Sequence, residues 1–490
     1  MTKPSAILVV LTVTACGPRM PVPSDASTQD TAWGDTQPSE SAVDVTSDEP
    51  LARDVIDVMD GTTVGDAAVP RIYDPVCAAR RPDLVSTPAG GADRCEGVSA
   101  PAEGTGSTWC SRGADVPGLR APAGFCVRRF AQVGLPRVMA RAPNGDLFVS
   151  SPSQGTGAGD TGGRGEILAL SDDNRDGTAE IHVFSVGLPD VHAIAFSADR
   201  QWLYFSTHGT VQRTRYTMGM RAEQTASREF IIGGPVTLPG GATGTDPLSM
   251  TLTMGRWTHG LAVSANDRLY VTNGEYSACQ FSPTGQVMHG SGSIYEAGSH
   301  TLTRVSTGFR NPMYARCHPC KELCLAAELG EDNRTGATEK LVAIESQRWF
   351  GYPCCDQRGT GAQQSSGLCN CVDQELSAIT LGDTPFGFDW EPGAWPAPYR
   401  NGIFVAQHGS FYAGDRYPGA GVVFLATDPD SGRPVGRPMR FLEATNELPQ
   451  PMRTLTRPSD VVFSRDGRMF VADDRGQSIY WLAPLTWRGP

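Results

Sequence analysis

The stretch Leu147-Phe148-Val149-Ser150 is the first of six copies of one short pattern in this chain of 490 residues. Each copy reads aliphatic, aromatic or Cys, aliphatic, small, which predicts a short β-strand. Successive copies begin 54 to 80 residues apart. That spacing is too long for a WD-type blade but suits four strands with long loops, and such a repeat indicates a solenoid or a propeller. The other copies are residues 203–206, 269–272, 323–326, 403–406 and 469–472.

Further strands surround each copy. An apolar stretch precedes it, as in residues 192–196, and the connection often holds a turn such as Asn144-Gly145 that favours a hairpin. Two more apolar stretches follow, as in residues 293–295 and 302–305. We therefore predict an all-β six-bladed propeller with four strands per blade, whose function sits at the loop-built mouth of a central channel.

The last blade lacks a strand at its outer edge. The chain ends at Pro490 soon after a third strand at residues 478–482, which would leave unpaired backbone groups. Residues 126–130, followed by Gly134-Leu135, have the pattern of an outer strand but precede the first blade. We expect this N-terminal strand to close the sixth blade, so that the propeller fills about residues 117–490.

The N-terminus has the pattern of an export signal. Lys3 is followed by an apolar run at residues 6–13, which is too short to span a bilayer. The run ends in Val13-Thr14-Ala15-Cys16, which resembles the lipobox of bacterial lipoproteins. The resemblance implies a signal peptide at residues 1–16 and lipidation of Cys16. The alternative is an ordinary signal peptide with a chance cysteine.

Residues 17–70 contribute about nine of the twelve net negative charges of the chain. They hold few large apolar side chains, so they cannot bury enough surface to fold and are expected to form a disordered acidic tether. A lead segment at residues 71–116 contains three cysteines. No basic patch with interleaved aromatics appears, which argues against a nucleic-acid partner. We expect a protein of the bacterial envelope, periplasmic or surface-exposed, that meets the membrane only through its lipid.

Twelve cysteines remain besides Cys16, an even number in an exported chain, which favours disulfides. Cys126 on the closing strand is expected to bond to one of the three cysteines of the lead segment, Cys77, Cys95 or Cys110. An alternative is a zinc site of Cys317, Cys320 and Cys324, because thiolates at this spacing can share a tetrahedral ion. Covalent haem is disfavoured, since Lys321 stands where that motif needs a histidine.

Residues 172–177 resemble the first half of an EF-hand loop. Asp172, Asn174 and Asp176 place oxygen side chains at alternate positions before a glycine, which predicts a calcium site. Val183 stands where the loop needs its bidentate glutamate, although Glu180 is near. The alternative is a polar hairpin loop in the first blade.

Several phrases around these strands resemble the glucose/sorbosone dehydrogenase family. They are residues 308–312, 328–332, 349–353, 404–410 and 457–460, in this order. The resemblance implies a six-bladed propeller that binds pyrroloquinoline quinone (PQQ), often with calcium, and oxidises sugars or aldehydes. It further implies that Arg310, Asn311 and Arg457 face the cofactor, and that backbone near Gly330 and Glu331 approaches the calcium.

The chemistry explains these residue types. Arginine supplies fixed cationic forks for a tricarboxylated ortho-quinone, and calcium polarises the quinone that accepts hydride. In the family, a histidine stands five positions before the first large aliphatic residue of blade three, here Leu261, and this chain has Arg256 there. Arginine stays protonated and cannot act as the base. The remaining candidates for the base are His259 and His408. For each of them the alternative is a purely structural role.

Two classes of function therefore remain. The first is an anchored quinoprotein that oxidises a small sugar or aldehyde and passes electrons to an unidentified acceptor. The second is a propeller that binds a sugar, polymer or protein without redox turnover, since the fold does not determine the function. A hydrolase is a weaker third reading, because no matching set of carboxylates is legible.

The lipobox-like sequence predicts that the mature chain begins at a lipidated Cys16. Mass spectrometry of the N-terminal peptide should find the lipid, and Cys16→Ala should release a folded protein into the soluble fraction. An unmodified Cys16, or cleavage at another position, would contradict the anchor.

Overall fold

A computed structural model describes residues 109–116, 118–153, 163–237, 241–275, 292–330, 338–355, 368–373, 375–380, 384–409, 420–444 and 456–487. The chain divides into two compact units, residues 1–69 and 70–490, and all described residues belong to the second. The predicted lipidation site, the tether, Cys77, Cys95 and Glu331 lie outside the described residues.

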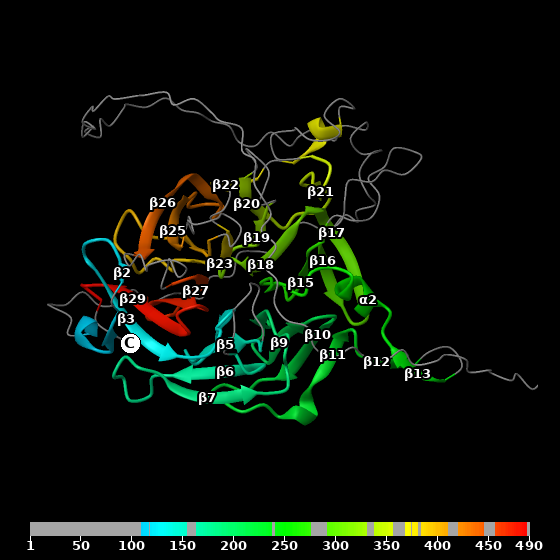
Figure 1. The fold of residues 1–490 in the computed structure, drawn as a ribbon, viewed down its shortest axis with the longest axis horizontal. Helices are drawn as coiled ribbons and strands as arrows, with labels where there is room; N and C mark the ends of the chain where they lie inside the picture. Colours follow the sequence, from blue (N-terminus) through cyan, green and yellow to red (C-terminus); the bar gives the residue numbers. More distant parts are fainter. Residues whose placement is uncertain are drawn as a thin grey trace, which may run out of the picture. The chain divides into compact units, whose positions relative to one another are not determined.

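Six sheets, antiparallel except for one short parallel strand in blade three, surround a common axis and form the six blades of a β-propeller (Figure 1). The first and second strands are β4 (Met139–Arg141) and β5 (Leu147–Ser151) in blade one, β8 (Ile194–Phe196) and β9 (Trp202–Thr207) in blade two, and β14 (Leu261–Val263) and β15 (Leu269–Asn273) in blade three. They are β18 (Asn311–Cys317) and β19 (Cys324–Leu329) in blade four, β23 (Pro385–Trp390) and β24 (Ile403–Gln407) in blade five, and β27 (Pro458–Phe463) and β28 (Met469–Asp473) in blade six.

The outer strands complete each sheet. The third and fourth strands are β6 (Glu166–Ser171) and β7 (Glu180–Ser185) in blade one, β10 (Thr210–Arg215) and β11 (Glu229–Ile232) in blade two, and β16 (Gly292–Gly298) and β17 (Thr301–Phe309) in blade three. They are β20 (Thr338–Ala343) and β22 (Ser377–Thr380) in blade four, β25 (Gly421–Thr427) and β26 (Pro434–Ala444) in blade five, and β29 (Ser478–Pro484) and β3 (Phe125–Gln132) in blade six. Short fifth strands are β21 (Arg348–Trp349), β2 (Leu119–Arg120) and β1 (Ala114–Asp115), in blades three, five and six.

Little other regular structure accompanies the blades in the described part of the chain. A two-stranded ribbon in the loops consists of β12 (Pro235–Thr237) and β13 (Thr243–Thr245). The short helices there are the 3-10 helices η1 (Trp109–Ser111), η2 (Thr225–Ser227) and η4 (Leu368–Cys371) and the α-helix α2 (Leu248–Thr253). None of these described helices has the length and apolar character that a membrane span requires.

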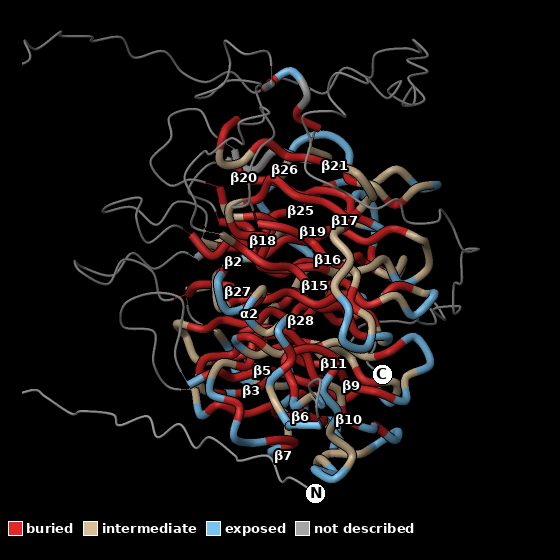
Figure 2. The backbone as a smooth tube through the Cα atoms, turned by 90° about the vertical axis from the view of Figure 1, so that its right-hand side faces the viewer, coloured by how far each residue is buried: buried red, intermediate tan, exposed pale blue. Residues whose placement is uncertain are grey.

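The six copies of the sequence pattern are the second strands of the six blades, so the predicted all-β fold and its blade order are confirmed. Every residue of β5 and β24 is buried, because a second strand is covered by neighbouring blades on both faces, whereas the outer strand β7 keeps exposed residues (Figure 2).

The small residue that ends each copy has a definite task in the first two blades. The Ser150 hydroxyl accepts a hydrogen bond from the Val138 amide at 3.0 Å and donates one to the His192 carbonyl of the next blade at 2.5 Å. Ser206 repeats the arrangement and donates to the His259 carbonyl at 2.7 Å. These hydroxyls link consecutive blades and satisfy backbone groups that are buried between them.

The N-terminal strand closes the ring as predicted. β3 pairs antiparallel with β29, with Cys126 opposite Ala483 and Gln132 opposite Ser478, and Figure 1 shows the two strands side by side in cyan and red. The segment ahead of β3 extends the closure further than predicted, because β1 pairs with β3 and β2 pairs with β26 of blade five. One short segment therefore binds two neighbouring blades.

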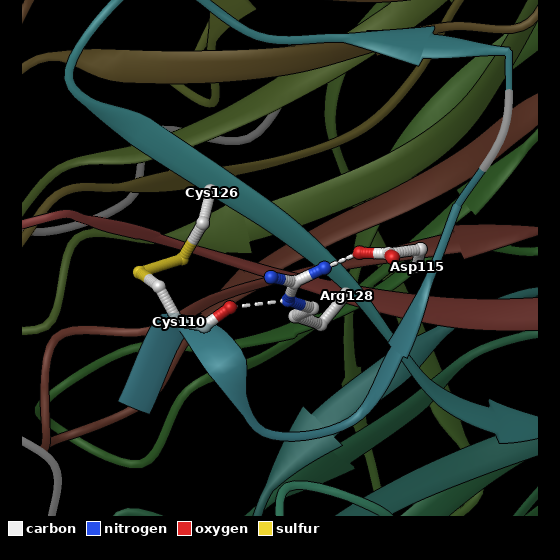
Figure 3. The surroundings of a disulfide bond; sticks show 4 residues. All are labelled: Cys110, Asp115, Cys126 and Arg128. Atoms are coloured by element: carbon white, nitrogen blue, oxygen red, sulfur yellow. Dashed lines mark hydrogen bonds and ion pairs between the residues drawn. A yellow bond between two sulfur atoms is a disulfide. The ribbon is translucent and has the colours of Figure 1, made fainter. Parts of the chain in front are cut away.

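A disulfide between Cys110 and Cys126 fastens this closing segment (Figure 3). Cys110 is thus the partner of Cys126 among the three candidates of the lead segment. The guanidinium of Arg128 on β3 donates to the Cys110 carbonyl and pairs with Asp115 on β1. The disulfide and this charged contact hold the same three pieces of chain together.

Other cysteines are also paired. Cys317 and Cys324 face each other across β18 and β19 and form a disulfide, and a second disulfide joins Cys355 to Cys369. The zinc alternative at Cys317 and Cys324 is wrong, because a disulfide consumes the two thiolates that the ion would need.

Removing the Cys110–Cys126 bond should destabilise the closed ring. The bond closes a loop with a sequence separation of 16, for which the loss of loop-closure entropy in the unfolded chain corresponds to about 3 kcal/mol. The double variant Cys110→Ser/Cys126→Ser should lower the free energy of unfolding in urea by about this amount, within the usual range of 2–4 kcal/mol. Unchanged stability would show that β3 holds the ring without covalent help.

Candidate functional site

The upper end of the channel is defined here as the end where each first strand starts and each second strand stops. The strand register places these positions together, with Asn311 opposite Leu329 in blade four and Pro458 opposite Asp473 in blade six. All the residues predicted to bind the cofactor or act as base, together with Gly330, belong to this end, either just before a first strand or just after a second strand. They are Arg256, His259, Arg310, Asn311, His408 and Arg457.

Three of the predicted residues gather around Gly274, which follows β15. The Arg256 amide donates to the Gly274 carbonyl at 3.1 Å. A Cβ atom on Gly274 would lie 2.4 Å from Asn311 Oδ1 and 2.9 Å from Arg256 Cδ, so only glycine fits between these side chains. The Arg310 carbonyl accepts a hydrogen bond from the Glu275 amide at 2.8 Å, which places Arg310 beside the same turn.

Arg310 is held from below by a buried ion pair. Its amide donates to Glu328 Oε1 at 2.6 Å, and Glu328 Oε2 pairs with Lys340 Nζ at 2.5 Å. Its Nη1 donates to the Gly330 carbonyl at 2.5 Å, and cofactor binding by Arg310 and calcium binding near Gly330 stay predictions. These bonds fix the backbone of Arg310 on rigid strands, as a binding site requires.

His408 lies in a buried charged network. Its Nε2 donates to Asp474 Oδ2 at 2.8 Å, and its Nδ1 accepts from Arg457 Nη2 at 2.8 Å. Arg137 pairs with the same Asp474 oxygen at 2.7 Å. Burial, followed by the charge of Arg457, lowers the pKa of His408 to about 3. Both ring nitrogens are in use and the ring is neutral, which leaves His408 poorly suited to accept a proton from a substrate.

His259 differs from His408 in one respect. Its Nδ1 donates to the Thr272 carbonyl at 3.1 Å, whereas its buried Nε2 has no hydrogen-bond partner among the described residues. Burial lowers the pKa of His259 to about 4, so the imidazole is neutral and Nε2 carries a free lone pair. His192 of blade two differs in its Nδ1 partner, which is the His259 carbonyl of the next blade at 3.2 Å, but its Nε2 is likewise without a described partner.

A row of rings crosses the upper end. Ring centroids lie 5.7 Å apart between Trp257 and His192, 5.3 Å between His192 and Tyr314, 5.1 Å between Tyr314 and Phe386, and 4.0 Å between Phe386 and His408. These five residues, the aromatic row, come from blades two to five. Trp257 is partly exposed and the other four are buried, so the row begins at the surface and fills the channel beneath it.

The predicted calcium loop forms a polar hairpin between β6 and β7. Asp172 pairs with Arg468 at 3.0 Å, Asp173 pairs with Arg221 at 2.6 Å, and the Asn174 amide donates to Asp176 at 3.2 Å. The described residues contain no group of three or more His, Cys, Asp or Glu side chains that could hold a metal ion. Calcium at this loop stays a prediction. Its binding would require Asp172 to break the ion pair with Arg468.

The residues of the upper end fit a planar anion in part. Arg256 and Arg310 are both partly exposed beside Asn311, and cationic forks next to an amide suit carboxylates and carbonyls. Arg457 is buried instead, and its Nε and Nη2 donate to the His408 carbonyl, to His408 Nδ1 and to the Gly409 carbonyl. It therefore orders the chain after β24, and cofactor contact by Arg457 stays a prediction.

Sequence reasoning missed Arg137 and Asp474, which complete the network of His408. The signal was present for Arg137, because it stands just before the first strand of blade one, as Arg310 and Arg457 do in blades four and six. Asp474 follows another aspartate at the end of β28, and its role depends on contacts between blades that the chain order does not reveal.

Comparison with known proteins supports the fold. No family model and no curated protein sequence matches this chain. The calcium structure of a Trichoderma reesei enzyme of carbohydrate-active family AA12 has a TM-score of 0.57 at 16% identity, over 76% of this chain and 98% of that one. The holo PQQ domain of a Coprinopsis cinerea pyranose dehydrogenase has a TM-score of 0.56 at 13% identity, over 75% and 99%. The predicted resemblance is thereby confirmed at the level of the propeller fold.

The buried histidines predict destabilisation in acid. The folded chain holds His259 neutral down to a pKa of about 4, whereas in the unfolded chain it binds a proton below about 6.5. The unfolded state therefore binds more protons in this window, and stability is lost as the pH falls, by up to about 1.4 kcal/mol per pH unit for each such histidine. His259→Gln should therefore make the unfolding free energy depend less steeply on pH between pH 6 and 5. The expected decrease in slope is about 1.4 kcal/mol per pH unit, the contribution of one bound proton.

Met218 provides the control for this measurement, because it is exposed and carries no titratable group. Met218→Gln should leave the slope unchanged, and urea unfolding at several pH values measures both variants. An unaltered slope in His259→Gln would show that His259 is not held neutral in the folded chain.

Proposed function

We propose that this protein is a sugar-oxidising quinoprotein that binds PQQ at the upper end of its channel. The observation that carries the proposal is the gathering of Arg256, Arg310 and Asn311 around Gly274, where two partly exposed arginines flank a buried amide on rigid strands. The fold shared with a pyranose dehydrogenase PQQ domain supports it.

Each of these residues has a place in the proposal. Arg256 and Arg310 would bind the carboxylates of PQQ, and Asn311 would bind a carbonyl oxygen through its side chain. The partly exposed ring of Trp257 at the start of the aromatic row offers a flat apolar surface for a planar molecule. A bound PQQ supplies the capacity to accept a hydride from a sugar or aldehyde substrate.

The base for this oxidation is best sought at His259. Arg256 remains protonated at the position where the resembling family has its histidine. His408 has both nitrogens in hydrogen bonds, whereas His259 Nε2 has no partner among the described residues. His259 is fully buried, so it would act through a small movement or through a bound water.

Calcium and the membrane anchor belong to the proposal as well. Carbonyl oxygens near Gly330 and Glu331 would hold calcium, although the Gly330 carbonyl accepts a hydrogen bond from Arg310 in this structure. Lipid on Cys16 would hold the enzyme in the bacterial envelope, where it passes electrons to an acceptor of unidentified kind.

A second candidate is a binding propeller without redox turnover. Arg256 at the position of the base favours it, because a guanidinium binds an anionic or hydroxylated ligand but cannot remove a proton. The carbohydrate-binding propeller would use the same upper end, so the two candidates differ in turnover and not in location.

Titration of the purified protein with PQQ in the presence of calcium tests the quinoprotein directly. We expect a saturable change in quinone absorbance, and Arg310→Ala should weaken binding by about 1.5–3 kcal/mol, as for hydrogen bonds to charged groups. Arg213→Ala is the matched control, because Arg213 stacks on Trp202 in blade two, away from the upper end. Absence of binding together with no dye reduction by any aldose or aldehyde would leave the binding propeller as the function.

Arg256→His and His259→Ala then separate binding from turnover. If His259 is the base, His259→Ala lowers dye reduction by a factor of about 100 or more at unchanged quinone affinity. If the missing histidine is what silences the site, Arg256→His creates or raises sugar-dependent dye reduction. Neither effect, in a wild type that binds PQQ, would mean that the base lies elsewhere.

A further inference from the structure

A cavity lies at the lower end of the channel, opposite the upper end, where each first strand stops. Its volume is about 990 Å³, and its wall includes residues of the first strands of all six blades. Cavities of this size hold small organic ligands. None of the residues gathered around Gly274 lines this cavity, so it is separate from the proposed quinone site.

Cationic side chains surround this lower cavity. Arg141 ends β4, Arg465 lies in the turn after β27, Arg200 lies in the turn after β8, and Lys321 lies in the turn after β18. Arg141 Nη1 donates to the Phe463 carbonyl at 3.1 Å, which positions the guanidinium between blades one and six. The four cations belong to four different blades, yet all line one cavity.

Acidic residues also line the wall, but protein groups occupy their oxygens. Asp389 accepts from the amides of Phe463 and Trp390 at 2.8 and 2.9 Å and pairs with Arg316 at 3.5 Å. Glu391 is 2% exposed and accepts four hydrogen bonds from the backbone amides of residues 393, 394, 395 and 401. Asp428 also lines the cavity, and its Oδ1 accepts from the amide and the hydroxyl of Ser431, both at 2.7 Å. These carboxylates are therefore engaged in organising the wall.

The charge of Arg141 is unfavourable in this setting. Burial lowers the pKa of Arg141, Asp389 opposes the shift, and the like charges of Arg465 and Arg200 lower the pKa further. The carboxylate of Asp466 raises the pKa of Arg141 in turn. Arginine remains protonated at neutral pH, and an anion in the cavity would add a favourable charge beside Arg141.

We propose that the lower cavity is a binding site for a small organic anion with two or more carboxylate or phosphate groups. Arginine forks from blades one, two and six would bind the charged groups, and the apolar stretches of the first strands would contact the carbon skeleton. The site does not depend on the proposed quinone function, because it uses other residues at the other end of the channel.

Isothermal titration calorimetry at constant ionic strength tests this site, with citrate and inorganic phosphate as probes and triethyl citrate as the uncharged control. We expect saturable binding of citrate, weaker binding of phosphate and no binding of triethyl citrate. Arg465→Gln and Arg141→Gln should each weaken citrate binding at least about tenfold, the effect of losing one charge-assisted hydrogen bond. Arg215→Gln, which removes an arginine stacked on Trp202 outside the cavity, should change nothing.

Several outcomes would overturn the proposal. They are a lack of saturable binding of both anions, unchanged citrate affinity in Arg465→Gln, and an equal loss in Arg215→Gln. Arg465 is exposed in a turn, so its variant decides the question even if Arg141→Gln fails to fold. Citrate titration of Arg310→Ala should match the wild type, and a loss of citrate binding in this variant without a loss in Arg465→Gln would place the anion at the quinone site instead.

Discussion

Pairing of β3 with β29 is the constraint on which the rest of the molecule depends. Without it blade six would end at an open edge, and blades one and six would not be held together. With it, six first strands face one axis and their polar groups are enclosed among protein atoms. Closure of the ring therefore demands that a charge buried between the blades find a partner there.

Arg316 shows how that demand is met. Its guanidinium crosses from blade four to donate to the Val461 carbonyl at 2.8 Å and the Met139 carbonyl at 3.1 Å, and it pairs with Asp460 at 3.0 Å. Asp460 lies so close to blade five that a Cβ atom on Gly387 would approach its Oδ1 to 1.7 Å. Burial raises the pKa of Asp460 to about 6 despite the arginine, so this pair contributes order between blades more than net stability.

The fold could be predicted because blades repeat and a repeat needs no long-range information. The closing strand was legible for the same reason, since residues 126–130 match the other outer strands. The pairing of β2 with β26 was not legible, because two residues carry no periodicity. Cys110 could not be distinguished from the other cysteines of the lead segment, since disulfide connectivity depends on distances between side chains.

The site divides along the same line. Local sequence motifs singled out Arg310, Asn311 and Gly330 as candidates, and the contact of Arg310 with Gly330 is seen only in the structure. The Arg457 contact with His408 joins two blades, so the sequence could not show that the guanidinium of Arg457 is engaged in hydrogen bonds within the protein. The basicity of a histidine depends on such contacts between blades.

This difference bears on chemistry at the upper end. A base must have a free lone pair, and among the two candidate histidines only His259 leaves a nitrogen without a described partner. His192 in the neighbouring blade also has an Nε2 without a described partner, but its Nδ1 bond joins blades two and three, whereas the Nδ1 bond of His259 to Thr272 stays within blade three. A catalytic role for His259 would thus be an addition to its hydrogen bond within blade three, and the guanidinium of Arg256 near Gly274 would favour an anionic ligand at this end.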